Sequence, residues 1–236
     1  MRGTRFRTRV ALLALATLAV ALTGCDRMPG YPKDAPAARP EQVTDFHALY
    51  AANCQACHGA NGQGGPAVDL ANPEYQGLVD DATLRKWIST GMPGTEMPAF
   101  AQSAGGILTD QQIDAIIGGM RSEWSKTDAF AGATPPPYAQ VQPGNAQHGQ
   151  LAYQARCAFC HQQPGRQQVT SPVYLSLVGD QALRTIIIAG RPDIHQPDWM
   201  HDGPLAAKDV TDIVTYLDSM RNSAAVSAAP TPQSAQ

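Results

Sequence analysis

Two short stretches of the 236-residue chain carry the side chains best suited to chemistry. Residues 54–58 read Cys-Gln-Ala-Cys-His, and residues 157–161 read Cys-Ala-Phe-Cys-His. On one helical turn, thiols three positions apart fall on the same face, and the next side chain is an imidazole. This pattern is typical of haem c attachment, in which both thiols form thioethers to the porphyrin and the histidine lies beneath the iron.

A single copy of this pattern is also compatible with a redox dithiol, or with half of a zinc site beside an incidental histidine. Two copies in one chain argue against both readings. Four of the five cysteines belong to the two motifs, and Cys25 stands alone. A disulfide framework would need a different pairing of cysteines. We therefore expect two haem c groups.

The composition fits small domains built around such a cofactor. The chain is 43% hydrophobic and 16% charged, as in ordinary soluble globular proteins, and its length predicts one or two domains. Only 6% of the residues are aromatic. All-α domains whose core is partly a buried porphyrin would need few large side chains.

The N-terminus predicts export and a lipid anchor. Four arginines precede an apolar run over residues 10–22, which is shorter than the ~20 residues that span a bilayer. Leu-Thr-Gly-Cys at residues 22–25 resembles a bacterial lipobox, so we expect residues 1–24 to be a lipoprotein-type signal peptide and Cys25 to be lipidated. The alternative is an ordinary signal peptide with an incidental cysteine. Asp26 favours retention on the periplasmic side of the inner membrane.

The charge of the exported chain excludes one class of partner. Removing residues 1–24 leaves 13 basic side chains against 20 acidic ones, a net charge of −7. No basic stripe remains for nucleic acid. The acidic surface instead favours a protein partner with a positive or neutral docking patch.

The remaining sequence repeats one order of elements twice. In the first half, a helix from Thr44 leads into the first motif, and a glycine-rich loop follows. A helix over residues 81–90, a methionine loop over 92–100 and a closing helix capped by Thr109 or Asp110 come next. The expected segments are a proline-rich tether (25–40), domain 1 (41–128), a linker (129–145), domain 2 (146–222) and a disordered tail (223–236).

With this order of elements, the chain resembles a di-haem member of the class I cytochrome c family over residues 41–128 and 146–222. The resemblance implies an all-α fold of two tandem domains, each around a covalently bound haem c. It also places Pro66 and Pro172 where a proline carbonyl orients the proximal imidazole. The residues it assigns are Cys54, Cys57, Cys157 and Cys160 for covalent attachment and His58 and His161 as proximal iron ligands.

The resemblance also concerns how the first and last helices of each domain pack. Tyr50 and Tyr153 match an aromatic contact between these helices. Gly149 matches a glycine that allows their close approach, but the first domain has Phe46 there. We therefore expect the first crossing to be wider or differently packed.

The sixth iron ligand of the first haem is predicted to be Met97. It is followed by Pro98, as in the family's methionine loop, and Met92 is the competitor. Thioether ligation opposite histidine favours ferrous iron and raises the reduction potential.

For the second haem, two alignments disagree. Met200 lies 43 residues after the first cysteine of its motif, as Met97 does in the first domain. Aligning Gly-Arg-Pro at 190–192 with Gly-Met-Pro at 91–93 instead puts Gln196 at the methionine position, beside His195. Met200 is the leading candidate and His195 the alternative. Gln196, His201 and an open position remain.

These features favour an electron carrier over an enzyme. We expect a membrane-tethered periplasmic cytochrome that passes electrons from a quinol-oxidising complex or dehydrogenase to a terminal oxidase or reductase. One alternative is a di-haem peroxidase or ligand-binding protein, motivated by the missing aligned methionine. Another is a fixed cytochrome subunit of a larger respiratory complex.

Overall fold

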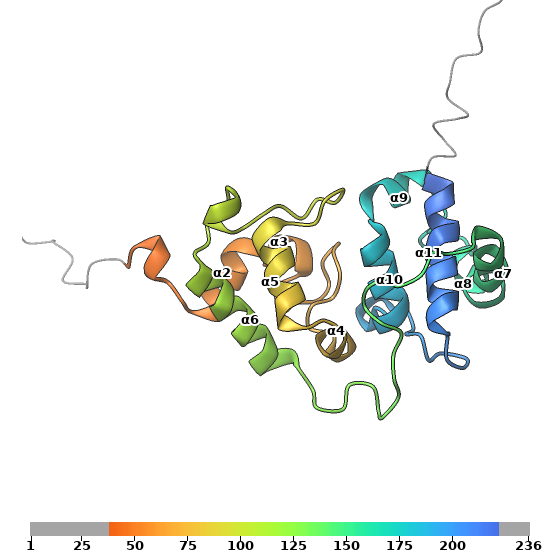
Figure 1. Ribbon diagram of the computed structural model, residues 1–236, viewed down its shortest axis with the longest axis horizontal. Helices are drawn as coiled ribbons and strands as arrows, with labels where there is room; N and C mark the ends of the chain where they lie inside the picture. The colour runs from red at the N-terminus through yellow and green to blue at the C-terminus, as the bar shows by residue number, and fades with distance from the viewer. Residues whose placement is uncertain (1–37, 222–236) are drawn as a thin grey trace, which may run out of the picture. The chain divides into compact units, whose positions relative to one another are not determined.

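Helices dominate the computed structural model, which describes residues 38–221 (Figure 1). In that range, β pairing amounts to two isolated bridges, Ala101–Leu108 and Arg191–Gln196. The prediction of an all-α protein is therefore confirmed. The predicted signal peptide, lipidated Cys25 and C-terminal tail lie outside the described residues, as does nearly all of the tether.

The helices follow the same order in each half. The first half contains η1 (Pro40–Gln42), α2 (Phe46–Asn53), α3 (Gln55–His58), α4 (Pro73–Leu78), α5 (Asp81–Thr90), η2 (Gln102–Ala104) and α6 (Asp110–Trp124). The second half contains α7 (Ala146–Arg156), α8 (Ala158–His161), α9 (Pro172–Leu177), α10 (Asp180–Ala189), η3 (Pro192–Ile194) and α11 (Ala207–Arg221). The closing helix, α6 or α11, packs against the helix that leads into the haem motif.

Several helix ends follow from local sequence signals. Helix α5 occupies the predicted residues and ends at Gly91, whose φ of 70° suits glycine. Thr109 caps α6 in a capping box with Gln112. The cap of α2 is Asp45 rather than Thr44, because the Asp45 carboxylate accepts a hydrogen bond from the Ala48 amide at 2.8 Å.

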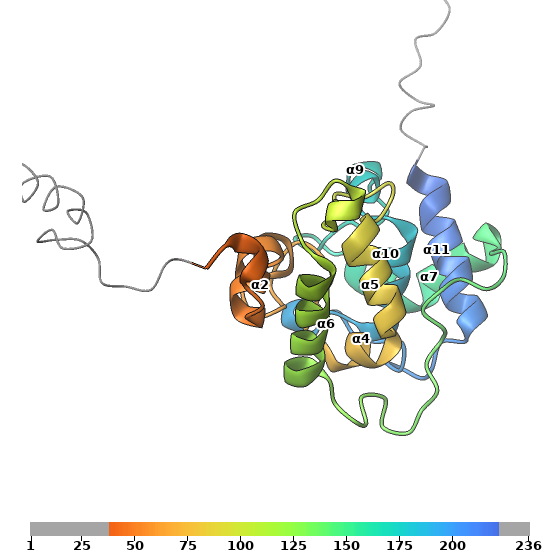
Figure 2. The same ribbon diagram turned by 60° about the vertical axis from the view of Figure 1, so that its left-hand side comes forward.

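The two crossings between first and last helices are packed in complementary ways. Gly149 is buried on α7, and a Cβ there would lie 1.9 Å from the Asp212 carbonyl oxygen on α11. In the first half the glycine is on the opposite helix, since a Cβ on Gly119 of α6 would lie 2.1 Å from the Phe46 ring. Figures 1 and 2 both show α7 alongside α11. The predicted difference in packing at Phe46 is confirmed.

The expected aromatic contacts between these helices are also present. The ring of Tyr50 lies 5.3 Å from that of Trp124, edge to face, and the ring of Tyr153 lies 5.6 Å from that of Tyr216. The Tyr50 hydroxyl donates to the Gly59 carbonyl at 2.9 Å, just after the first motif. The closing helices therefore support the segments that carry the motifs.

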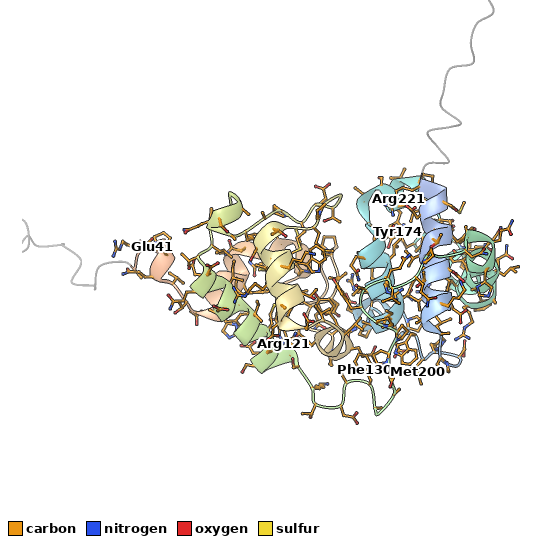
Figure 3. All side chains as sticks on the ribbon, in the orientation of Figure 1. Glu41, Arg121, Phe130, Tyr174, Met200 and Arg221 are labelled. Carbon is orange, nitrogen blue, oxygen red and sulfur yellow. The ribbon has the colours of Figure 1, made fainter. Side chains whose placement is uncertain are left out.

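An arginine at the end of each closing helix ties that helix to the short helix before α5 or α10. Arg121 donates to the carbonyls of Gln76 and Val79, and Arg221 donates to those of Leu175 and Val178. Arg121 also forms an ion pair with Asp81, the first residue of α5, and Arg221 forms one with Asp180, the first residue of α10. Figure 3 labels both arginines, at corresponding ends of α6 and α11.

The segment between the halves is held by a buried arginine on α10. Arg184 is 2% exposed and donates to the carbonyls of Pro137 and Tyr138 and to the Thr211 hydroxyl, at 2.8 to 3.1 Å. A buried guanidinium is stable only when its donors are satisfied, so these bonds fix the segment to the second half.

Each half has its own hydrophobic core around its closing helix. Ala189 nevertheless joins the first core, and from Pro40 onward the described residues belong to one compact unit. No helix within residues 38–221 is long and apolar enough to cross a membrane.

Candidate functional site

The two cysteine motifs have the same backbone conformation. Cys54 and Cys157 each sit between two helices with φ −119° and ψ −37°. The amides of His58 and His161 both donate to the carbonyl of the motif's first cysteine at 3.0 Å. Each motif therefore forms one helical turn with both thiols and the imidazole projecting from it.

The four motif cysteines are free thiols. Cys57 and Cys160 are exposed, while Cys54 and Cys157 are half-buried. Burial raises the pKa of Cys54 to about 12 and that of Cys157 to about 11, which keeps both thiols protonated at neutral pH. Free thiols three positions apart fit the formation of two thioethers.

Both proximal imidazoles are oriented by a backbone carbonyl. Nδ1 of His58 lies 2.9 Å from the Val68 oxygen, and Nδ1 of His161 lies 3.0 Å from the Gln167 oxygen. A carbonyl can only accept, so the proton is on Nδ1, and Nε2 keeps the lone pair that an iron needs. The donor sets of both motifs therefore fit a haem c.

The prediction that prolines orient these rings was wrong. The carbonyls belong to Val68 and Gln167 instead of Pro66 and Pro172. Each lies on the loop that follows its motif, the first proximal loop (residues 59–72) or the second (residues 162–171). Pro172 is the first residue of α9, where its missing N–H and fixed φ suit the start of a helix.

The environment of His58 favours its neutral form. Burial lowers its pKa, the Val68 carbonyl raises it, and the positive charge of Arg191 lowers it again. A neutral imidazole is the form that ligates iron.

The first distal loop, residues 91–101, follows α5 and contains Met97. The Met92 amide donates to the Met97 carbonyl at 3.1 Å, and the Met97 amide donates to the Thr95 hydroxyl at 3.2 Å. The Met97 side chain is half-buried against the first core. Met92 is also half-buried.

The second distal loop, residues 190–206, agrees with the Gly-Arg-Pro alignment. Gly190 ends α10 with φ 69°, matching Gly91, and the Arg191 amide donates to the Gln196 carbonyl at 2.9 Å, as Met92 does to Met97. Gln196 therefore takes the backbone position of Met97. Its Oε1 lies 3.0 Å from Nε2 of His161, the nitrogen that would bind iron.

The other candidate ligands of the second half lie elsewhere on this loop. Met200 comes four residues after Gln196 and is 43% exposed; Figure 3 shows it at the edge of the second half. His195 is exposed and adopts a left-handed φ of 62°. His201 is exposed and lies 3.4 Å from the Asp202 carboxylate.

Two further groups near these loops were not found from the sequence. Arg191 is 6% exposed and donates to the carbonyls of Gly65 and Ala67 on the first proximal loop, at 3.0 and 2.8 Å. The first proximal loop thus contacts the second distal loop. An arginine in the place of Met92 was the signal available in the sequence.

Glu74, at the start of α4, is the second group. Burial and the carboxylate of Asp198 raise its pKa to about 8.

Two segments, residues 41–118 and 144–217, match the family described as cytochrome C oxidase, cbb3-type, subunit III. The chain belongs to this cytochrome c family. It is therefore a helical c-type cytochrome involved in electron transfer. One matched segment lies in each of the two halves described above, and each contains one cysteine motif.

Named relatives are redox proteins of greater length. The chain is 28% identical over 174 residues to a cbb3-type cytochrome c oxidase subunit CcoP of Azospirillum sp. (strain B510), covering 65% of this chain and 46% of that protein. It is 36% identical over 102 residues to the dihydro-heme d1 dehydrogenase of Pseudomonas aeruginosa (strain PAO1), covering 41% of this chain and 18% of that protein. The chain thus spans less than half the length of either.

A solved structure, the reducing HAO-like protein complex Kustc0457/Kustc0458 of Kuenenia stuttgartiensis, is similar over 81% of this chain and 99% of that chain. Its TM-score is 0.39 and its sequence identity is 17%. At this level the likeness adds nothing to the argument.

Proposed function

We propose that the chain carries two covalently attached haem c groups and acts as a membrane-tethered periplasmic electron carrier. The observation that supports this most directly is the repeated motif geometry. Both motifs place two free thiols and one imidazole on a single helical turn, and both imidazoles donate from Nδ1 to a loop carbonyl. When bound, each haem supplies an iron that gains and loses one electron.

Two cysteines and one histidine would hold each haem. Cys54 and Cys57 would anchor the first haem, and Cys157 and Cys160 the second. Their neighbouring histidines, His58 and His161, would present Nε2 to the iron. The carbonyls that bind Nδ1 fix the ring tautomer and make the imidazole a better electron donor to the metal.

In the first half, Met97 is the proposed sixth ligand. Its loop is tied to the end of α5 by the Met92 amide, so the thioether is presented from a fixed backbone. A soft thioether opposite histidine stabilises ferrous iron, which suits a haem that accepts electrons at a high potential.

The placement in a respiratory chain rests on the N-terminal sequence and on the relatives. Lipidation of Cys25 would hold the protein at the periplasmic face of the inner membrane. We propose that electrons arrive from a quinol-oxidising complex or dehydrogenase and leave to a terminal oxidase or reductase. Support comes from the family description and from a relative that is named as an oxidase subunit.

A reconstituted electron-transfer assay tests this proposal. The purified holoprotein is mixed with membranes from its own organism, and haem absorbance is followed after addition of quinol and then oxygen. We expect reduction by quinol and reoxidation by oxygen at rates comparable to membrane respiration. Haems that remain oxidised with quinol, or reduced with oxygen, would contradict the proposed role.

A second candidate is a fixed subunit of a larger oxidase complex, which the family description favours. Gentle solubilisation followed by affinity purification separates the two roles. A carrier is recovered largely alone, whereas a subunit is recovered in constant ratio with its partners.

A further inference from the structure

Two side chains face each other at the second motif, and both present lone pairs. In the neutral imidazole of His161, Nδ1 donates to the Gln167 carbonyl and Nε2 is an acceptor. The side-chain nitrogen Nε2 of Gln196 lies 3.2 Å from the Pro197 carbonyl oxygen and donates to it. The side-chain oxygen Oε1 of Gln196 is therefore the atom turned towards His161, 3.0 Å from the Nε2 of that histidine. The two atoms therefore face each other between the motif and the loop. A metal binds nitrogen and oxygen at about 2 Å each, so an iron held by both would need Oε1 to withdraw by about 1 Å.

The backbone of the loop holds Gln196 in this position. The amides of Arg191 and Gln196 each donate to the other's carbonyl at 2.9 Å, which closes a short antiparallel bridge. The Arg191 guanidinium is buried, binds both oxygens of Asp193 at 2.7 and 2.8 Å, and donates to carbonyls of the first proximal loop. Gln196 is therefore presented from a rigid loop.

We propose that Gln196 supplies the distal oxygen ligand of the second haem iron, in the place that Met97 takes in the first half. This proposal rests on the proposed haem attachment at both motifs. An amide oxygen is a harder donor than a thioether, so it stabilises ferric iron over ferrous iron. The second haem consequently has a lower potential than the first, and an electron shared between them rests on the first.

The same ligand makes the second iron accessible to small molecules when reduced. A neutral amide oxygen binds ferrous iron weakly, and a soft ligand such as carbon monoxide can replace it. A groove of about 550 Å³ runs beside this loop. Its lining includes Glu74, His195, Gln196 and Asp198, so solvent reaches the Gln196 side chain.

The test uses the purified di-haem protein and three variants. Near-infrared and magnetic-resonance spectra identify the ligands of each iron, and a potentiometric titration gives both potentials. For the unmodified protein we expect one histidine–methionine haem and one haem of lower potential without a thioether. Gln196→Met should give the second haem a histidine–methionine spectrum, raise its potential and abolish carbon monoxide binding there. Met200→Leu should leave both spectra unchanged, and Gln196→Leu should alter only the second.

Three results would overturn the proposal. They are two histidine–methionine haems in the unmodified protein, loss of such a signature in Met200→Leu, and an unaltered second haem in Gln196→Leu. If Gln196→Met does not fold, the spectra of the unmodified protein and of Met200→Leu still show whether a methionine binds the second iron. The number of haems per chain is counted in every sample. Two haems with the wrong ligand refute only the role of Gln196, whereas fewer than two in the unmodified protein refute the attachment on which it rests.

Discussion

The tight crossing of α7 and α11 gives a sharp prediction about stability. A Cβ added at Gly149 would lie 1.9 Å from the Asp212 carbonyl oxygen and 2.4 Å from its carbon. Ordinary contact needs roughly 3.5 Å, so the helices would have to separate by about 1.5 Å. The obstacle is backbone, so no side-chain rotation relieves it. Asp212 is fully buried and accepts from His148 and Lys208, and movement of α7 also strains this network.

These contacts set the expected magnitude for Gly149→Ala. Overpacking against fixed backbone costs about 3 kcal/mol. The greater helix propensity of alanine returns about 1 kcal/mol. The net loss is therefore about 2 kcal/mol of unfolding free energy, in the half that carries the second motif.

Gly118→Ala is the matched control. Gly118 is exposed on α6, and a Cβ there meets nothing within 4 Å. Only the propensity gain remains, so this variant should be stabilised by about 1 kcal/mol. Urea denaturation of the holoprotein, followed by circular dichroism and by haem absorbance, measures both. A Gly149→Ala protein as stable as Gly118→Ala would refute the close crossing.

Three further predictions follow from buried contacts. Gly119→Ala should destabilise the protein because its Cβ meets the Phe46 ring, and adding Phe46→Ala should recover part of that loss; strictly additive free energies in urea would contradict the contact. The pKa of Glu74 is raised from 4.5 to about 8, so its ionisation destabilises the fold as the pH rises from 4.5 to 8. Glu74→Gln should therefore flatten the decline of the thermal midpoint over this pH range. A variant with the same pH profile as the unmodified protein would contradict the effect of Glu74. Arg184→Ala should lower the free energy of unfolding by about 3–5 kcal/mol, because buried carbonyls lose their donors. Arg184→Lys should lower it by less. A loss under about 1 kcal/mol for the alanine variant, measured by urea denaturation, would show that the segment between the halves does not depend on this side chain.

Much of the helical framework could be predicted because its signals are local. Helix α5 has a periodic apolar face and a terminal glycine, and the structure reproduces its predicted bounds. Helices α4 and α9 were missed because six residues are too few for periodicity. The proline that begins each of them was an available start signal. Arg121 and Arg221 both follow a methionine near the end of a closing helix. That repeated Met-Arg pair was an available signal.

The second distal ligand could not be fixed from the sequence because spacing conflicted with alignment. Helix α5 begins 23 residues after His58, but α10 begins 19 residues after His161. The shorter proximal loop brings Met200 to the same count as Met97 without the same position in the loop. Only the backbone pairing of Arg191 with Gln196 identifies the equivalent residue.

We propose above all that this cytochrome carries two covalently bound haems that exchange electrons reversibly. The most direct measurement is the number of haems per chain after denaturation and removal of free haem, combined with a reductive and oxidative titration of the native protein. We predict two haems per chain that remain attached, and two one-electron transitions that retrace on reoxidation. One haem or none, or haem released by denaturation, would contradict the account.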